Sequence, residues 1–282
     1  MKRVVTGVVT AALAAAIVLY LKPVYFAAAA TAVAVVAASE YGALARRIVV
    51  SRTITWALWL AVCVLAVVSA TANGLVDVPL GTVLTVADAW FAAAAVVLAL
   101  AIGVGFDSHA DVRNRLLTSS LFAFGVLWLG LFLVAAINLH ASSPVLLFWV
   151  LAVASLGDIG AYYGGRRFGR RPLAPVLSPK KTIAGAVSGL IASAVTGVAV
   201  FLLWRGFDSL SIDIPVVALL CGAAAQAGDL VASMLKRAVE VKDTGALLPG
   251  HGGLLDRLDS VLLATPVLYI AAQAGATPSL QP

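Results

Sequence analysis

Residues 183 to 204 read IAGAVSGLIASAVTGVAVFLLW, a run that contains no charged residue. A transmembrane helix needs about 20 mainly apolar residues to cross the hydrocarbon core of a bilayer, and this run has that length. Similar runs recur along the whole chain of 282 residues. Hydrophobic residues make up 62% of the chain and charged residues only 11%, whereas a soluble domain carries roughly 25% charged residues. The composition therefore excludes a water-soluble globular fold and indicates an integral membrane protein.

The apolar runs predict an all-α polytopic membrane protein with about nine transmembrane helices. They lack the alternation of barrel strands, and an open sheet would expose its backbone to lipid. Because no Pro/Ser-rich linker divides the chain, we expect one membrane domain, with about five helices in residues 1–140 and about four in residues 141–282. The predicted spans are 4–21, 24–44, 54–72, 84–105, 116–137, 144–164, 183–204, 214–235 and 258–275.

The basic residues are distributed unevenly between the predicted loops. If the N-terminus is cytoplasmic, seventeen of the nineteen lysines and arginines fall on the cytoplasmic side, and only Lys22 and Arg205 fall outside. Cytoplasmic loops carry an excess of Lys and Arg, so we predict a multi-pass protein of the cell (inner) membrane with its N-terminus inside and its C-terminus outside. This topology and attraction to anionic lipid headgroups explain the net charge of +6, so we expect no nucleic acid partner.

The first 105 positions are expected to contribute little chemistry. Asp88 lies inside a predicted span, but it is close enough to the helix start to reach the outer surface. His109 and His140 are expected in solvated loops, and the distant Cys63 and Cys221 are expected to be packing residues. We therefore look for the functional site in the remaining part of the chain.

From Asp158 onward the polar residues change in character. Asp158 lies among glycines at the end of the sixth predicted span, and four arginines separate it from Ser178-Pro179-Lys180-Lys181-Thr182. Thr182 can cap the next helix, and two lysines beside the free N–H groups of a helix start favour an anion. A loop that contacts only lipid phosphates would have the same residues, so this segment alone leaves both interpretations open.

The last polar stretch is more specific. Four aspartates and four cationic residues lie between Asp229 and Asp259, with several glycines among them. This mixture suits a triphosphate and a divalent metal, because carboxylates bind Mg²⁺ while Lys and Arg neutralise phosphate charge. Asp256 and Asp259 are three positions apart at a helix start and project from nearly the same face. We predict that Asp229 and Asp256 share the metal, and the alternative is that the aspartates merely pair with neighbouring cations.

These residues resemble the signature of the phosphatidate cytidylyltransferase family, also called CDP-diacylglycerol synthases. The signature combines Ser, Lys-Arg, Lys-Asp, His-Gly-Gly, Asp-Arg and Asp at spacings that are all met here. The matching residues are Ser233, Lys236, Arg237, Lys242, Asp243, His251, Gly252, Gly253, Asp256, Arg257 and Asp259. The family's Ser-Pro-Lys-Lys-Thr and Gly-Asp-Leu elements also stand here, at 178–182 and 228–230. Ala184 and Ala232 depart from it, because the family usually has glutamate at both positions.

The resemblance implies a nucleotidyltransferase that moves CMP from CTP to phosphatidic acid, forming CDP-diacylglycerol and pyrophosphate in phospholipid biosynthesis. It implies Mg²⁺ as the cofactor and leaves a second cation and a homodimer open. The implied catalytic residues are Asp229, Asp256, Lys236, Arg237, Asp243 and Asp259, of which Asp229 and Asp256 are the metal ligands. The implied substrate-binding residues are Ser178, Lys180, Lys181, Ser233, Lys242, His251, Gly252, Gly253, Arg257 and Asp158.

Such a site belongs at the cytoplasmic membrane face, because CTP is confined to water and phosphatidic acid to the bilayer. We expect a cavity open to both, next to helices that pack closely through Gly185 and Gly189. Three other functions fit part of the sequence. They are another CTP-dependent lipid enzyme, such as a CDP-archaeol synthase or a polyprenol kinase, a transporter, and a scaffold without enzymatic activity.

Overall fold

The computed structural model describes residues 12–51, 53–76, 86–106, 111–206, 210–247 and 252–274. Residues 12–20 are helical and precede the labelled elements. The helices of the first half are α2 (Pro23–Ile48), α3 (Ile54–Ala72), α4 (Val86–Phe106), α5 (Val112–Gly125), the π-helix η2 (Val126–Gly130) and α6 (Leu131–Ser142). The second half contains α7 (Pro144–Phe168), β1 (Pro172–Ala174), β2 (Ser178–Thr182), α8 (Ile183–Arg205), α9 (Asp213–Ala238), α10 (Leu255–Leu258) and α11 (Val261–Gln273).

Seven helices in the described ranges are long and apolar enough to cross a membrane. They correspond to the second through the eighth predicted spans, and one of them combines α5, η2 and α6 into a single helix of 31 residues. The prediction of a polytopic helical membrane protein is confirmed at this level. The count of nine spans and the orientation of the two ends stay predictions.

The two terminal predicted spans differ from the other seven. Residues 4–11 of the span 4–21 lie outside the described residues, and 12–20 are helical. In place of the span 258–275 the chain forms the short α10, a turn, and then α11 of 13 residues with Pro266 inside it. At 1.5 Å per residue α11 is about 20 Å long, which is shorter than the roughly 30 Å hydrocarbon core. The predicted ninth span therefore begins too early, because residues 259 and 260 form a turn.

A two-stranded hairpin departs from the expected all-helical fold. Strands β1 and β2 pair antiparallel, with Pro172 opposite Thr182 and Ala174 opposite Ser178. They occupy the loop predicted between the sixth and seventh spans. Thr182 ends the hairpin and caps α8, since the Gly185 N–H donates to its Oγ1 at 3.1 Å. This cap confirms the prediction made for Thr182.

Helices α7 and α8 pack with their backbones in near contact. A Cβ atom added at Gly189 would lie 2.9 Å from the Ala161 Cβ and 3.1 Å from the Gly157 carbonyl oxygen. A Cβ atom at Gly185 would lie 2.8 Å from the Ala161 carbonyl oxygen. Only glycine fits at these positions, so the predicted close packing through Gly185 and Gly189 is confirmed.

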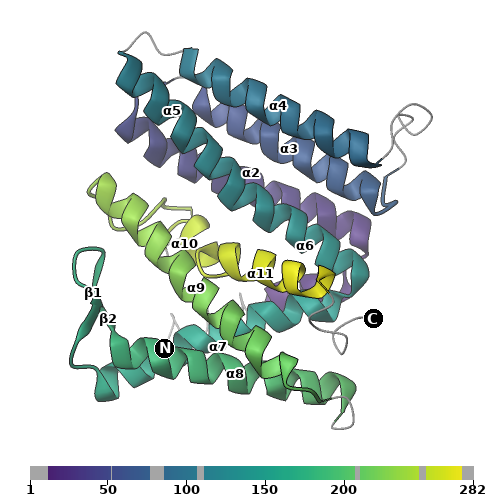
Figure 1. Cartoon of the computed structure of the whole chain (residues 1–282), viewed down its shortest axis with the longest axis vertical. Coiled ribbons are helices and arrows are strands. Elements are labelled where there is room, and N and C mark those ends of the chain that lie inside the picture. The colour runs from purple at the N-terminus through teal and green to yellow at the C-terminus, as the bar shows by residue number, and fades with distance from the viewer. Residues whose placement is uncertain are drawn as a thin grey trace.

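The helices form two groups with a third layer between them (Figure 1). Helices α2 to α6 lie side by side in one group, and the antiparallel pair α7 and α8 forms the other edge. Helix α9 crosses this pair, and α11 packs against α9, α6 and α7. The last part of the chain therefore lies between the two groups, where it contacts both.

His140 lies in the interior of the first group. It belongs to α6, its side chain is fully buried, and its ring stacks on Phe26 with 3.9 Å between the ring centroids. Its Nε2 lies 2.9 Å from the Val18 carbonyl oxygen. The prediction of a solvated loop is wrong for His140. Helix α6 continues to Ser142, and the helical residues 12–20, which precede α2, pack against the His140 side chain through Val18. His109 lies outside the described residues.

The basic ends of several helices lie at one end of the bundle. The last turns of α2, α7 and α9 each carry two basic residues. Asn114, at the start of α5, accepts from the N–H of Val50 just after α2, at 3.1 Å. Arg237 of α9 donates from Nε to the Leu177 carbonyl oxygen of the hairpin, at 3.4 Å. The hairpin, α10 and these basic ends therefore share one end of the bundle, on the left in Figure 1.

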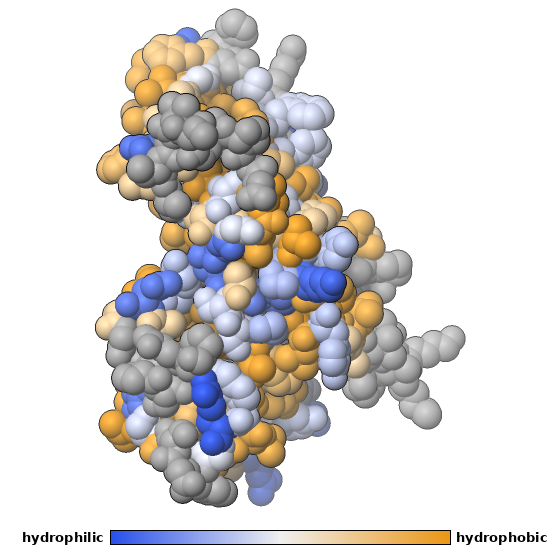
Figure 2. Space-filling view, turned by 90° about the vertical axis from the view of Figure 1, so that its right-hand side faces the viewer, coloured by the Kyte–Doolittle hydropathy of each residue, from blue (hydrophilic) through white to orange (hydrophobic). Residues whose placement is uncertain are grey.

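The opposite end of the bundle is also polar at its centre. Figure 2 looks onto this end, where hydrophilic side chains gather in the middle and apolar side chains form the flanks. Asn73 and Asn138 join α3 to α6 by a hydrogen bond of 3.0 Å, and Asn138 donates to Ser69 at 2.8 Å. Polar side chains thus lie at both ends of the bundle, where a membrane-spanning protein meets water.

The substitution Gly189→Leu tests the contact between α7 and α8. We expect it to lower the melting temperature of the detergent-purified protein, because overpacking a tight contact costs about 1–3 kcal/mol. Gly103→Leu on α4 is the matched control, since a Cβ at Gly103 meets nothing within 4 Å. Equal melting temperatures for the two variants would contradict the packing described above.

Candidate functional site

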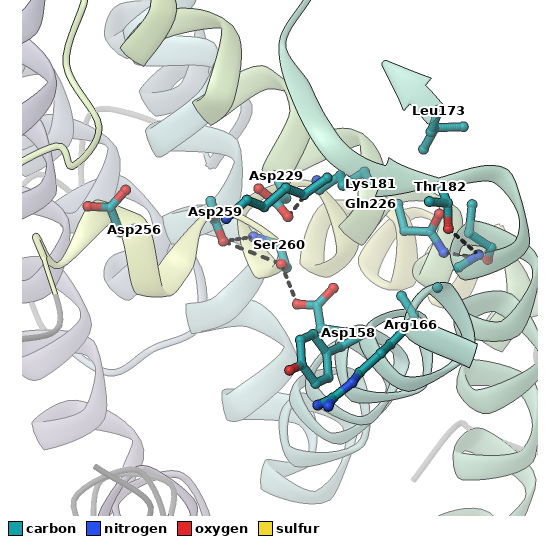
Figure 3. Close-up of a pocket in the computed structure, with 16 residues that line it drawn as sticks. Asp158, Arg166, Leu173, Lys181, Thr182, Gln226, Asp229, Asp256, Asp259 and Ser260 are labelled. Atoms are coloured by element: carbon teal, nitrogen blue, oxygen red, sulfur yellow. Dashed lines mark hydrogen bonds and ion pairs between the residues drawn. The ribbon is translucent and has the colours of Figure 1, made fainter. Parts of the chain in front are cut away.

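A cavity of about 660 Å³ lies where α7, the hairpin, α8, α9 and the turn before α11 meet. Its wall combines carboxylates and cationic side chains with apolar surface (Figure 3). The lining residues are Asp158, Ala161, Tyr162, Gly165, Arg166, Leu173, Lys180, Lys181, Thr182, Gly185, Ala186, Gln226, Asp229, Asp256, Asp259 and Ser260. The closely packed glycines of α7 and α8 thus form part of the same wall that carries the charged groups.

Three carboxylates lie around Ser260: Asp158 of α7, Asp229 of α9 and Asp259 of the turn before α11 (Figure 3). The Ser260 hydroxyl donates to Asp158 Oδ2 at 2.7 Å, and the Ser260 N–H donates to Asp259 Oδ1 at 2.8 Å. Burial and then the negative charge of Asp229 raise the pKa of Asp259 to about 7. Burial is the larger cause, and a cation in the cavity would relieve the second, the neighbouring negative charge.

Lys181 brings one positive charge to this group. Its Nζ lies 2.5 Å from Asp229 Oδ2, so the hairpin is joined to the middle of α9. The two side chains are 28% and 29% exposed, and an incoming anion can therefore reach the ammonium group. Lys180, the preceding residue, also lines the cavity and is exposed. The hairpin thus presents two neighbouring lysines to whatever binds there.

Asp256 is held by a second set of donors. Its Oδ1 lies 2.6 Å from the Lys236 ammonium, and its Oδ2 accepts from the N–H groups of Thr244 and Gly253 at 2.8 and 3.0 Å. Burial opposes ionisation, but the hydrogen bonds from Lys236, Thr244 and Gly253 outweigh it and lower the pKa of Asp256. The residue is therefore ionised at neutral pH and fixed in orientation.

Gly252 has a backbone conformation that favours glycine. Its φ angle is +81°, in the left-handed region. A Cβ atom there would also lie 2.8 Å from Asp256 Oδ2 and 3.4 Å from Asp243 Oδ1. The first glycine of the His-Gly-Gly element is thus required both by its dihedral angle and by the carboxylates beside it.

Two of the carboxylates in the cavity wall are the residues that the sequence predicts as metal ligands. Within the described ranges, no three His, Cys, Asp or Glu side chains form a group that could hold a metal ion. Mg²⁺ is usually bound by one or two carboxylates together with substrate phosphates and water. Asp229 and Asp256 both line the cavity, and in the view of Figure 3 Asp259 lies between them. The assignment of Asp229 and Asp256 as metal ligands stays a prediction.

The structure brings many of the predicted site residues to one place. The cavity wall contains Asp158, Lys180, Lys181, Asp229, Asp256 and Asp259. Lys236 contacts it through Asp256, and Arg237 instead donates to the hairpin carbonyl of Leu177. The predicted residues that are described but do not line the cavity also include Ser178, Ser233, Lys242, Asp243, Gly252, Gly253 and Arg257. His251 lies outside the described residues.

Sequence reasoning missed Glu40, which lies in α2. Its carboxylate accepts from the N–H groups of Leu254 and Leu255 at 2.9 and 2.8 Å, next to the loop that holds Asp256. The expectation that the first 105 residues contribute little chemistry did not predict this contact. A signal was present, because a carboxylate inside a predicted span is costly and usually functional. Ser260 was also missed, and only the turn before α11 explains its place in the cavity.

Comparisons with known proteins show which family this chain is similar to. A model of the cytidylyltransferase family matches residues 1–274. A phosphatidate cytidylyltransferase of Staphylococcus saprophyticus is 36% identical over 169 residues, which cover 60% of this chain and 54% of that protein. Those of Brucella suis and Bacillus subtilis are 41% and 39% identical over 132 residues, which cover 47% of this chain and 48% and 49% of those proteins. The matched part thus spans about half the length of these relatives.

Proposed function

The chain belongs to the cytidylyltransferase family, and on that premise we propose that it transfers CMP from CTP to phosphatidic acid. The products are CDP-diacylglycerol and pyrophosphate, and the reaction serves phospholipid biosynthesis. The observation that carries the proposal is the single cavity in which Asp158, Asp229, Asp256 and Asp259 meet the hairpin lysines. Carboxylates and ammonium groups at one place suit a polyphosphate that is bound together with a cation.

The reaction needs positioning and charge neutralisation more than proton transfer. A phosphate oxygen of phosphatidic acid bonds to the α-phosphorus of CTP, the bond between that phosphorus and the bridging oxygen breaks, and pyrophosphate leaves with the electron pair. The attacking monoester is already largely dianionic at neutral pH, so no strong general base is required. The cavity therefore has to hold two polyanions close together in line.

The hairpin lysines are the first candidates for phosphate binding. Lys181 can exchange its contact with Asp229 for a phosphate oxygen, and the exposed Lys180 lies beside it. Arg166 at the rim adds a third positive charge. A phosphate with at least two oxygens available could then contact these groups while its lipid or nucleoside part extends away from the hairpin.

The carboxylates are proposed to bind Mg²⁺ between Asp229 and Asp256, with Asp259 and Asp243 in support. The metal would supply positive charge to the α-phosphoryl oxygens. Lys236 keeps Asp256 ionised and oriented through its 2.6 Å contact. Tyr162, Leu173 and Ala161 give the cavity an apolar part, which suits the acyl chains of a lipid substrate.

We also propose nine spans, with the N-terminus and the cavity facing the cytoplasm of a bacterial inner membrane. The basic ends of α2, α7 and α9 lie at the cavity end of the bundle, which supports this orientation under the positive-inside rule. A cytoplasmic cavity at the membrane face would receive CTP from water and phosphatidic acid from the inner leaflet.

Radiolabelled CTP tests the reaction class. Purified protein with Mg²⁺, phosphatidic acid and CTP labelled at the α-phosphate is expected to place label in lipid and to release pyrophosphate in equal amount. Transfer of a γ-label instead would indicate a lipid kinase. Preference for an ether-linked archaeal lipid phosphate would indicate a CDP-archaeol synthase. An absence of turnover with any lipid phosphate would refute the proposal and favour a transporter or scaffold.

Substitution of the proposed metal ligands tests the assignment within that reaction. Asp229→Asn and Asp256→Asn are each expected to lower kcat by roughly 100-fold or more while membrane insertion is unchanged, because the charge that stabilises the transition state is lost. Asp213→Asn is the matched control, since Asp213 lies at the other end of α9 from the cavity. Near-normal rates for both cavity variants would show that these carboxylates do not bind the metal.

A reporter fused after Pro282 tests the predicted topology. With nine spans and a cytoplasmic N-terminus, Pro282 lies outside the cytoplasm. We therefore expect alkaline phosphatase fused at this position to be active and green fluorescent protein fused there to be dark. A second fusion in the hairpin, after Val176, is expected to give the opposite pattern. A cytoplasmic signal at Pro282 would mean an even number of spans, as the short α11 would allow.

A further inference from the structure

We propose that Glu40 is a positioning residue, which holds the loop of Asp256 against α2 in the orientation that the cavity needs. The effect of Glu40 on kcat rests on the proposed function, whereas its effect on the order of the loop does not. Glu40 lies in the middle of the C-terminal half of α2, far in sequence from the residues that line the cavity. Through Glu40 the N-terminal helices would help to position the site, a role that the sequence motifs do not indicate.

The Glu40 carboxylate is surrounded by donors from the loop. Its Oε1 accepts from the Leu254 N–H at 2.9 Å, and its Oε2 accepts from the Leu255 N–H at 2.8 Å. The Thr244 hydroxyl lies 3.0 Å from the same Oε2. Both oxygens are therefore engaged, and the donors come from both sides of the loop that carries His-Gly-Gly.

Two glycines leave the space that this contact requires. A Cβ atom at Gly245 would lie 2.7 Å from Glu40 Oε1, and one at Gly253 would lie closer still to Oε2 and to the Thr244 hydroxyl. Side chains at these positions would displace the carboxylate. The second glycine of the His-Gly-Gly element is thus explained by Glu40, just as the first is explained by its φ angle and by Asp256.

Thr244 connects Glu40 to the cavity. Its hydroxyl lies 3.0 Å from Glu40 Oε2 and also 3.0 Å from Asp256 Oδ2, while its N–H donates to Asp256 at 2.8 Å. The side chain of Thr244 is buried, with 7% exposed. Asp256 in turn binds Lys236 and lines the cavity. A shift of Glu40 would therefore move the proposed metal ligand without touching the substrate itself.

Helix α2 is a firm support for this contact. Tyr41, the next residue, is 1% exposed and donates from its hydroxyl to the Leu121 carbonyl oxygen of α5 at 2.6 Å. Gly42 packs so closely against Thr55 of α3 that a side chain there would clash. Because α2 is fixed to both α5 and α3 next to Glu40, the loop takes its position from the N-terminal helices.

Glu40→Gln tests the proposal, with Glu240→Gln as the matched control. The substitution keeps the size of the side chain but replaces one acceptor oxygen with an NH₂ group, which cannot accept from a backbone N–H. We expect kcat to fall roughly 10- to 100-fold, as for other residues that orient a ligand, and KM for CTP to change by less than about threefold. Glu240 is an exposed turn residue, and Glu240→Gln is expected to retain the wild-type kcat.

Hydrogen–deuterium exchange gives a readout that does not depend on activity. In Glu40→Gln we expect faster exchange in the peptide 252–258, which contains the two donor N–H groups, and unchanged exchange in α7 and α8. Faster exchange throughout the protein, or a kcat that recovers fully once the folded fraction is corrected for, would mean that Glu40 only stabilises the fold and would overturn the proposal. So would an unchanged kcat.

The two proposals can fail separately. If the wild-type protein does not turn over CTP under any of the conditions above, the proposed function falls, and the exchange experiment alone decides the role of Glu40. Local acceleration in 252–258 would then support the positioning of the loop by α2. Unchanged exchange in that peptide would overturn it.

Discussion

The structure depends on the requirement that carboxylates at the edge of an apolar bundle be matched by donors. Asp229 has Lys181, Asp256 has Lys236 and two backbone N–H groups, and Asp158 has Ser260. An unpaired carboxylate at such a place would cost several kcal/mol. The donors come from the hairpin, from α9, from the loop before α10 and from the turn before α11, so satisfying the carboxylates also fixes the hairpin, the loop and the turn relative to α7 and α9.

The same pairing keeps the cavity ready for an anion and a cation. The lysines that neutralise Asp229 and Asp256 are the groups that a phosphate would attract, and the carboxylates are the groups that a metal would attract. A bound phosphate could therefore replace a carboxylate as the partner of a lysine, and a bound metal could replace a lysine as the partner of a carboxylate. Asp259 accepts from the Ser260 N–H, and burial and then the charge of Asp229 raise its pKa to about 7. A cation in the cavity would relieve part of this negative charge.

Glycine determines how closely these elements approach. In α7 and α8 the absence of side chains at Gly185 and Gly189 allows backbone contact beside the cavity. In the loop, Gly252 supplies a left-handed φ angle, and Gly253 makes room for Glu40 and Thr244. The N-terminal helices and the C-terminal helices meet through this loop. The two groups seen in Figure 1 are thus joined at the site as well as by their apolar surfaces.

The sequence by itself determined the class of fold, the spans from α2 to α9 and most of the charged residues of the cavity. Apolar runs and local motifs depend on neighbouring residues, and these can be read along the chain. Tertiary structure decided that Glu40 supports the loop of Asp256, that His140 is buried, and that Ser260 lies between Asp158 and Asp259. Apart from the contact between the neighbours Asp259 and Ser260, these contacts join residues that are distant in sequence, so no local pattern encodes them. They exist only because helix packing brings those backbones together.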